Sequence, residues 1–327
     1  MGNRGLSRSS CLAFVWLGLV ALSAAVVTWL PLLYSPATVD LYGIDQPPLT
    51  ASHWLGTDTY GRDVLAMLLF GARTVFLISF PVALAGTMLG VALGGIAGFW
   101  GNYRAKFSPL QYGIVGTLLS FLLGYFFYWA VGIVGLLCTG ILWAIFKQRQ
   151  RQLPLPLDSL VLGLIAVVTS IPRLILVLTL AAVQSPSVGR LFLILLLTYW
   201  VLPAQLVRAE LLRIRELPYV EAAYAAGLPP FWVLLRHALP NAWQSVITMM
   251  PLSVASLIGL ETTLSFLGVG LPPSVASWGR LLAAAQQSPT DWWLIVIPGL
   301  VLLFTTLSLR QISKQIAAWQ RTPNVTR

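Results

Sequence analysis

The fold class follows from an uncharged segment at residues 74–103, which reads TVFLISFPVALAGTMLGVALGGIAGFWGNY between Arg73 and Arg104. Its 30 residues exceed the roughly 20 apolar residues with which an α-helix crosses the hydrocarbon core of a bilayer. Stretches of the same kind recur along the chain, and charged residues separate them sharply. The segment therefore predicts a membrane-spanning helix that is one of several.

The overall composition leads to the same class. Of 327 residues, 57% are hydrophobic and 9% are charged, and the mean hydropathy is +0.82. An ordinary soluble domain is about 45–50% apolar and about 25% charged, so soluble packing cannot hide this much apolar surface. The two cysteines, Cys11 and Cys138, have no nearby partner in the sequence and indicate no disulfide framework. We expect residues 1–327 to form a single transmembrane domain.

Seven uncharged stretches are candidate spans, and Arg173 alone interrupts the fourth: 9–39, 74–103, 107–146, 159–189, 191–207, 237–260 and 292–309. The stretch at 107–146 would make a helix of about 60 Å, twice what the membrane core requires. Aromatic residues 125–129 lie at its middle, as they would at a membrane surface. We interpret it as a hairpin, which predicts an all-α, polytopic helical bundle with about eight transmembrane helices.

The distribution of basic residues supports eight spans. With eight spans both termini are cytoplasmic, and fifteen lysines and arginines lie on the cytoplasmic side against four outside. A single span at 107–146 would move the basic cluster of 208–236 outside and remove this bias. The net charge of +10 then reflects orientation against anionic membrane lipid, and no nucleic-acid partner is needed. The sizeable loops are 35–73 outside and 208–240 inside.

The cytoplasmic loop contains the most specific motif, which is YVEAAYAAGLPP at 219–230, followed by RHALPN at 236–241. The pattern predicts a short helix, a turn at Gly227 and a second helix that begins at two prolines, which suit the first turn of a helix. This knob resembles the EAA loop of binding-protein-dependent ABC importers, which docks into a groove on the ATP-hydrolysing subunit. The resemblance implies that six residues couple the chain to that ATPase: Glu221, Ala222, Ala223, Gly227, Leu239 and Pro240.

Two further motifs narrow the resemblance. Residues 55–64 read LGTDTYGRDV, and residues 261–270 read ETTLSFLGVG and are followed by SWG at 277–279. In this order they resemble segments of the dipeptide, oligopeptide and nickel permeases, in particular the C-type permease subunit. The chain is similar to this family over two long regions, about 50–105 and 157–312.

One segment departs from that family, whose members usually have six spans. About fifty residues at 103–156 stand where the family has a short cytoplasmic link. An insertion there must cross the membrane an even number of times if the downstream loops are to keep their sides. The hairpin at 107–146 meets this condition. Its role stays open between lipid-facing packing and a docking site for another subunit.

The resemblance implies a permease subunit of an ABC importer in the bacterial inner membrane, forming the translocation path for peptide-like or related small solutes. The sequence has no Gly-Lys-Ser/Thr phosphate loop, so we expect no enzymatic activity and separate ATP-hydrolysing subunits. We also expect an extracytoplasmic solute-binding protein and a second related permease in a heterodimer, but no cofactor or metal. Peptides, nickel complexes, glutathione-like molecules and sugars remain open as cargo.

Two charged residues close to apolar spans are candidates for the translocation path or its gate. Arg173 is the most deeply placed charge, and it is expected to face the protein interior or a water-filled path, with a structural ion pair as the alternative. Glu261 ends a long apolar span, and it either contributes to the path or caps the next helix at the outer surface.

Three charges mark the outer loop. Asp58, Arg62 and Asp63 either pair with each other or contact the binding protein, and nothing beside them suggests acid–base catalysis. His53 and His237 lie on opposite sides of the predicted membrane, so they cannot share a metal ion.

An ion-coupled secondary transporter is the alternative function. Such carriers usually place acidic residues within spans and interrupt helices at the midplane of the membrane. Only Glu261 lies near a span here, and the helical knob would have no role in such a carrier. A membrane-embedded enzyme is a third class, for which the sequence offers no nucleophile, base or metal constellation.

Overall fold

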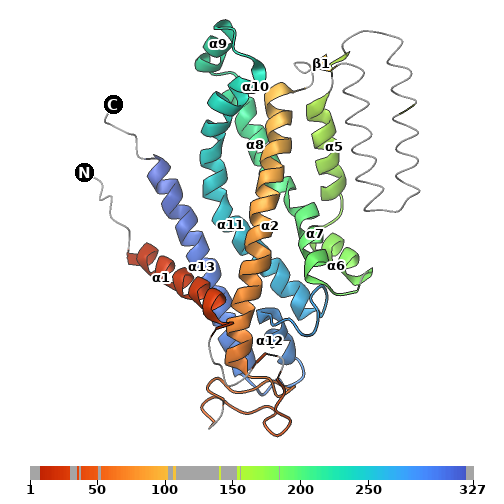
Figure 1. The fold of residues 1–327 in the computed structure, drawn as a ribbon, viewed down its shortest axis with the longest axis vertical. Coiled ribbons are helices and arrows are strands. Elements are labelled where there is room, and N and C mark those ends of the chain that lie inside the picture. Colours follow the sequence, from red (N-terminus) through yellow and green to blue (C-terminus); the bar gives the residue numbers. More distant parts are fainter. Residues whose placement is uncertain are drawn as a thin grey trace.

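In the part of the chain that the structure describes, a bundle of helices is accompanied by one pair of two-residue strands (Figure 1). The computed structural model describes these residues: 8–29, 35–36, 38–50, 53–101, 106–107, 140, 153–154, 156–183 and 185–321. The longer helices are α1 (Arg8–Val26), α2 (Val64–Trp100), α5 (Leu157–Thr169), α6 (Arg173–Val183), α7 (Val188–Tyr199), α8 (Val201–Ile214), α11 (Leu239–Phe266) and α13 (Trp293–Arg321). The shorter elements are α9 (Pro218–Ala225), α10 (Pro230–Val233), the π-helical turn η1 (Leu234–Ala238), α12 (Trp278–Ala284) and the antiparallel strands β1 (Lys106–Phe107) and β2 (Leu153–Pro154).

Within the described residues, five helical segments are long and apolar enough to cross a membrane: Arg8–Val26, Val64–Trp100, Val188–Ile214, Pro230–Phe266 and Trp293–Gln320. Helices α5 and α6 qualify together as a sixth, broken span, because they are bent by 74° at a break that contains Pro172. These segments confirm the prediction of a polytopic helical membrane protein. The predicted hairpin at 107–146 lies almost entirely outside the described residues, so the total of eight spans stays a prediction.

Helix α2 begins at Val64, well before the uncharged stretch that starts at residue 74. The carboxylate of Asp63 accepts a hydrogen bond from the backbone N–H of Ala66 at 2.7 Å and so caps the first turn. The outer loop predicted at 35–73 therefore ends at residue 63, which corrects that boundary. Charged residues do not mark a helix start, because a helix can continue outward past the apolar part of its sequence.

Helix α2 runs through the middle of the bundle and packs against α8, α7, α11 and α1 (Figure 1). Glycines recur at every fourth position where α7 and α8 cross it: Gly86, Gly90, Gly94 and Gly98. Small residues at this spacing let two membrane helices approach closely. The approach is closest at Gly94, where a Cβ atom would lie 2.2 Å from the carbonyl oxygen of Ala204 in α8.

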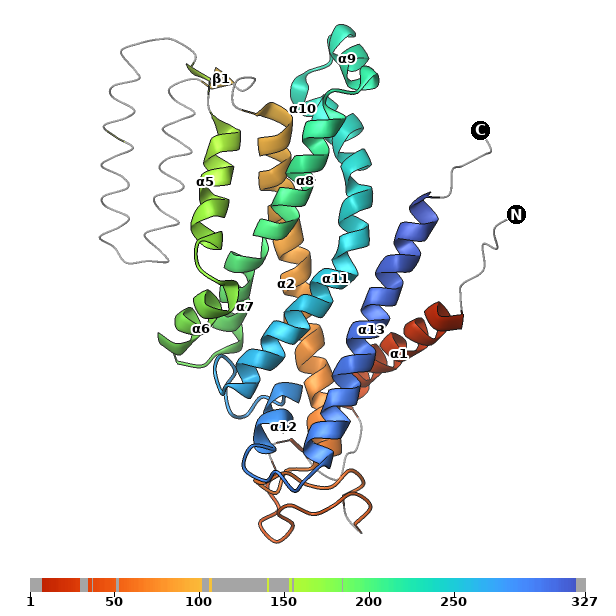
Figure 2. The ribbon, with the colours of Figure 1, turned by 180° about the vertical axis from the view of Figure 1, so that it is seen from behind.

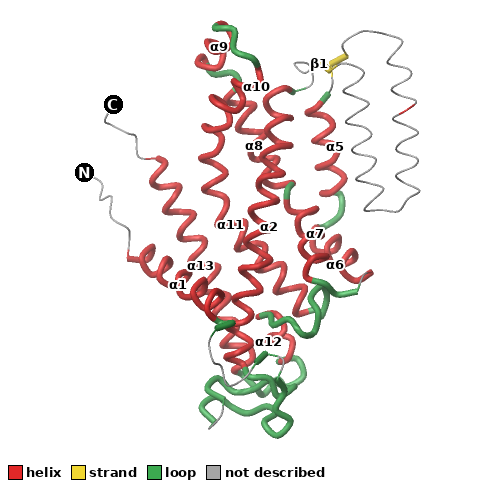
Figure 3. Tube along the Cα trace, in the orientation of Figure 1, coloured by secondary structure: helices red, strands yellow, loops and turns green. Residues whose placement is uncertain are grey.

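The two ends of the bundle carry different structures (Figure 2). At one end α9, α10 and η1 form a helical knob, residues 217–241. At the opposite end, residues 38–50 and 53–63 form an irregular cap loop near α12, where most of the loop structure gathers (Figure 3). The fold therefore separates the two sets of predicted contact residues by the length of the bundle.

Candidate functional site

The knob owes its shape to a proline and a glycine. Pro218 takes the first turn of α9, where its missing N–H costs nothing. Gly227 has a φ angle of +79°, and the N–H of Leu228 donates to the carbonyl of Ala223 at 3.2 Å. This is the Schellman ending of a helix, in which the residue of left-handed conformation is usually glycine. The structure thus contains the short helix and the turn that the sequence predicted.

One face of α9 is buried and the opposite face is open. Val220 is fully buried in an apolar cluster with side chains of α2, α8 and α11, and Ala223 lies on the same buried face. Glu221, Ala222 and Gly227 are exposed. Among the predicted coupling residues of α9 and the turn that follows it, Ala223 therefore supports the core of the knob, whereas Glu221, Ala222 and Gly227 are open to a partner.

The knob rejoins the bundle at the start of α11. Pro240 lies in the first turn of α11, and without an N–H it cannot donate to the carbonyl of Arg236, as an α-helix would require. The wider turn η1 stands directly before it. Leu239 is half-buried and Pro240 is exposed. The side-chain amide of Asn241 donates to the hydroxyl of Tyr219 at 2.9 Å, which ties α11 to α9.

Two aromatic residues extend the open surface of the knob, and the EAA motif alone does not mark them. Phe231 and Trp232 of α10 are 61% and 48% exposed, and the guanidinium of Arg236 lies 5.7 Å from the centre of the Trp232 ring. Exposed aromatic groups beside an arginine are enriched where proteins bind one another. The feature of the sequence that could have identified them is an aromatic pair directly after Pro229 and Pro230, outside any predicted span.

At the opposite end, the three predicted contact residues bond within the chain. Asp58 is fully buried, and Arg62 donates to its carboxylate from Nε and Nη2 at 2.7 Å. Asp63 caps α2 and lies 2.9 Å from Nδ1 of His53. Pairing between Asp58 and Arg62, one of the two alternatives, is therefore present. A contact with a binding protein stays a prediction, and the burial of both carboxylates leaves little of them exposed for it.

The cap loop is fastened to the segment that leads into α13. The indole N–H of Trp293 donates to the carbonyl of Thr57 at 3.1 Å, and the amide of Gln287 donates to the hydroxyl of Tyr60 at 2.7 Å. These bonds hold side by side two segments that are more than 200 positions apart in the sequence. A protein that docks on this end would therefore contact both segments.

Two carboxylates, Asp45 of the cap loop and Asp291 before α13, meet at this junction. Ser288 donates to Asp45 at 3.2 Å and Thr290 donates to Asp291 at 3.3 Å. Burial raises the pKa of Asp291 above its ordinary value, and the neighbouring Asp45 carboxyl raises that pKa further. Within the described residues, no group of three or more histidine, cysteine, aspartate or glutamate side chains could hold a metal ion.

The raised pKa of Asp291 gives a prediction for the pH dependence of stability. The folded protein binds this proton more tightly than the unfolded chain, so its contribution to stability decreases as pH rises from about 4 through the folded pKa. Asp291→Asn, which cannot ionise, should raise the melting temperature by about 1–3 °C at neutral pH, with no gain near about pH 4. Thermal unfolding of the detergent-purified protein at several pH values measures this. An equal gain at every pH would contradict the assignment.

Glu261 lies fully buried in α11 and bonds to its own chain. Its Oε1 accepts hydrogen bonds from the hydroxyls of Ser265 at 2.7 Å and Ser277 at 2.9 Å. Ser277 in turn accepts from the N–H of Gly279 and caps α12. The contacts thus match the alternative in which Glu261 supports the start of the next helix. A role in the translocation path stays a prediction.

Arg173 begins α6, directly after the bend in the broken span. Its guanidinium carbon lies 5.3 Å from the centre of the Tyr199 ring in α7. Its Nε and Nη2 are buried, and neither has a hydrogen-bond partner among the residues that the structure describes. A cation–π contact is worth about 0.5–2 kcal/mol and leaves the N–H donors of the guanidinium unused. Arg173 is therefore a half-buried charge with two buried donors that no described residue uses.

Comparison with known proteins places these features in one family. Residues 136–321 match the family described as binding-protein-dependent transport system inner membrane component. A putative peptide transport system permease protein of Brucella suis is 28% identical over 306 residues, which cover 93% of this chain and 84% of that protein. The dipeptide transport system permease protein of Bacillus subtilis is 28% identical over 262 residues, which cover 79% of this chain and 65% of that protein.

The matched region contains the helical knob and the helices from α5 to α13, so the resemblance first seen in short motifs extends through more than half of the chain. Permeases of such systems translocate solute, with partner subunits that hydrolyse ATP and a binding protein that delivers the solute. The chain belongs to the binding-protein-dependent transport system inner membrane components and is the membrane-spanning permease subunit of an ABC importer.

Proposed function

We propose that this subunit imports peptides, and that it forms the translocation path with a second, related permease chain. Both relatives described above are named as transport permeases for peptides or dipeptides. The observation that carries the coupling part of the proposal is the open face of α9, where Glu221 and Ala222 are exposed at one end of the bundle. An ATP-hydrolysing subunit docks on this face, with Phe231 and Trp232 beside it.

The two ends of the bundle then face opposite sides of the membrane. The knob and the cap loop lie at opposite ends of the bundle (Figure 1), and in this orientation the knob is in the cytoplasm and the cap loop is outside. A solute-binding protein docks on the cap loop and the α12–α13 connection. Both termini are cytoplasmic in this orientation. The segment at 107–146 lies almost entirely outside the described residues, and we keep the prediction that it adds a transmembrane hairpin to the six-span core.

Arg173 is proposed to lie on the path of the peptide. A peptide carries a terminal carboxylate, and a guanidinium forms strong, charge-assisted hydrogen bonds to carboxylates. The buried Nε and Nη2 of Arg173 have no partner in the described part of the chain, and Tyr199 holds the guanidinium in place. The guanidinium can therefore donate hydrogen bonds to the carboxylate of a peptide in the path without first breaking an internal ion pair.

Uptake of a labelled dipeptide tests both parts of this proposal. The chain is reconstituted in vesicles with its second permease, ATPase subunits and binding protein, and we expect uptake that requires ATP. Arg173→Leu should reduce the rate at least about tenfold at low peptide concentration, because a charge-assisted hydrogen bond is lost.

Arg173→Lys is the matched control, since it keeps the positive charge and should retain part of the uptake. Uptake by the wild-type complex at the same rate without ATP would contradict the import mechanism. Unchanged uptake kinetics in Arg173→Leu, with normal insertion, would remove only Arg173 from the path.

A further inference from the structure

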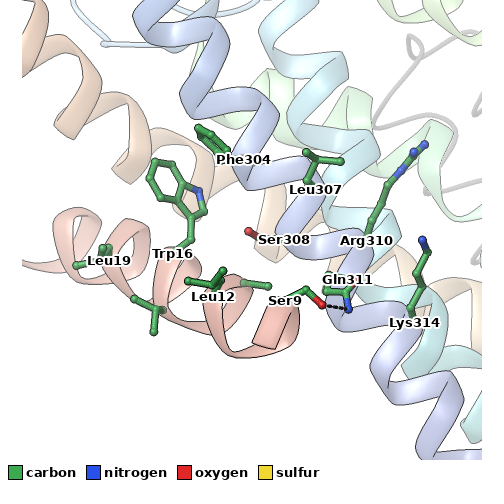
Figure 4. A pocket seen from close by; sticks show the side chains of 12 residues that line it. Ser9, Leu12, Trp16, Leu19, Phe304, Leu307, Ser308, Arg310, Gln311 and Lys314 are labelled. Carbon is green, nitrogen blue, oxygen red and sulfur yellow. Dashed lines mark hydrogen bonds between the residues drawn. The ribbon is translucent and has the colours of Figure 1, made fainter. Parts of the chain in front are cut away.

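A groove of about 690 Å³ opens between α1 and α13, on the outer surface of the bundle (Figure 4). The two helices are joined by hydrogen bonds at its edge, from the indole N–H of Trp16 to the hydroxyl of Thr305 at 3.1 Å and from Ser10 to Gln315 at 3.0 Å. The volume lies within the range of about 300–1,000 Å³ that is usual for small-molecule sites.

The lining of the groove is apolar along most of its length. Leu12 and Leu19 of α1 and Phe304 and Leu307 of α13 line it, and Leu12 is 70% exposed. Such side chains are stable on a membrane helix where hydrocarbon covers them. The apolar part of the groove therefore fits the acyl chains of a lipid.

Polar and cationic side chains lie at one end of the groove, on the C-terminal part of α13 (Figure 4). Arg310 and Lys314 are one helical turn apart on the same face of α13, and both are exposed. Neither forms an ion pair with any residue in the described part of the chain. The amide of Gln311 lies between them in sequence and donates to Ser9 at 3.1 Å.

We propose that this groove binds an anionic phospholipid, whose phosphate lies between Arg310 and Lys314 and whose acyl chains cover the apolar lining. Basic groups beside apolar grooves between transmembrane helices attract anionic head groups, at about 1 kcal/mol for each charge near the surface. An amphipathic ligand satisfies both halves of the groove, the two cations and the exposed leucines. Lipid binding in this groove is separate from peptide import and does not depend on the cargo.

Native mass spectrometry of the assembled importer, titrated with phosphatidylglycerol or with phosphatidylcholine, tests the charge requirement. We expect tight retention of phosphatidylglycerol, and an increase in its dissociation constant on the order of 30-fold when Arg310→Gln and Lys314→Gln are combined. The exchanged pair, Arg310→Lys with Lys314→Arg, keeps both charges and should retain the lipid. Equal retention in the glutamine pair and the wild type, or equal retention of the two lipids, would overturn the proposal.

A second measurement identifies the occupant without removing any charge. A photo-crosslinking amino acid in place of Leu12 reports what covers the groove in the assembled complex, because this exposed side chain lines it. A crosslink to phospholipid supports the proposal. A crosslink to the second permease chain would show that protein covers the groove, and it would overturn the proposal.

Discussion

Gly227→Asp is expected to leave the protein in the membrane and to abolish most of the solute-stimulated ATP hydrolysis of the assembled importer. Gly227 is exposed and has a φ angle of +79°, and a Cβ atom added there would meet no atom of the other described residues within 4 Å, apart from its two chain neighbours. The new carboxylate would therefore point away from its own chain, toward the proposed ATPase groove. The backbone cost is only on the order of 1 kcal/mol, too little to unfold the chain.

Gly227→Asn is the matched control for this prediction. Asparagine has nearly the same size and tolerates left-handed backbone as well as aspartate does, but it adds no charge. It should retain more activity and more bound ATPase than Gly227→Asp. Glu221→Ala should weaken coupling more mildly, because it removes one exposed charge-assisted hydrogen bond and leaves α9 intact.

The readouts are the solute-stimulated ATPase rate of the reconstituted complex and co-purification of the ATPase subunits. Stimulation equal to that of the wild type in both Gly227→Asp and Glu221→Ala would show that the open face of α9 does not couple transport to ATP hydrolysis.

Gly94→Ala is expected to cause a large loss of stability from a single added methyl group. Its Cβ would lie 2.2 Å from the carbonyl oxygen of Ala204, so α2 and α8 must move apart along their whole contact. Overpacking of this kind costs about 3 kcal/mol, which corresponds to a decrease in melting temperature of roughly 6–12 °C. Thermal unfolding of the detergent-purified protein measures the difference.

The neighbouring Gly95→Ala is the matched control. A Cβ atom there has one close neighbour, Cδ1 of Leu211 at 3.8 Å, which is an ordinary van der Waals contact. Alanine also favours the helix over glycine by about 1 kcal/mol. Gly95→Ala should therefore be neutral or slightly stabilising. Equal melting temperatures for the two variants would show that α2 and α8 do not pack as closely as the structure has them.

The sequence predicted the helical membrane class, the family and the turn at Gly227 correctly, because each depends on local information. Hydropathy needs only a run of apolar residues, and the EAA motif combines proline and glycine at positions where their backbone preferences decide the conformation. The same reasoning placed the outer loop boundary at residue 73, since a capping carboxylate such as Asp63 is not distinguishable from other charges before its partner is known.

The sequence by itself thus determined the helical membrane class and where the knob turns, since both follow from the chemistry of neighbouring residues. Only the tertiary structure decided that Glu261 holds Ser277 and that Arg173 lies over Tyr199 without an ion pair in the described residues. The groove beside Trp16 likewise depends on Thr305, a residue 289 positions away. Such contacts are set by how whole helices cross and pack. An apolar helix face is equally stable against lipid and against protein, so the apolar pattern of the sequence does not encode how the helices cross.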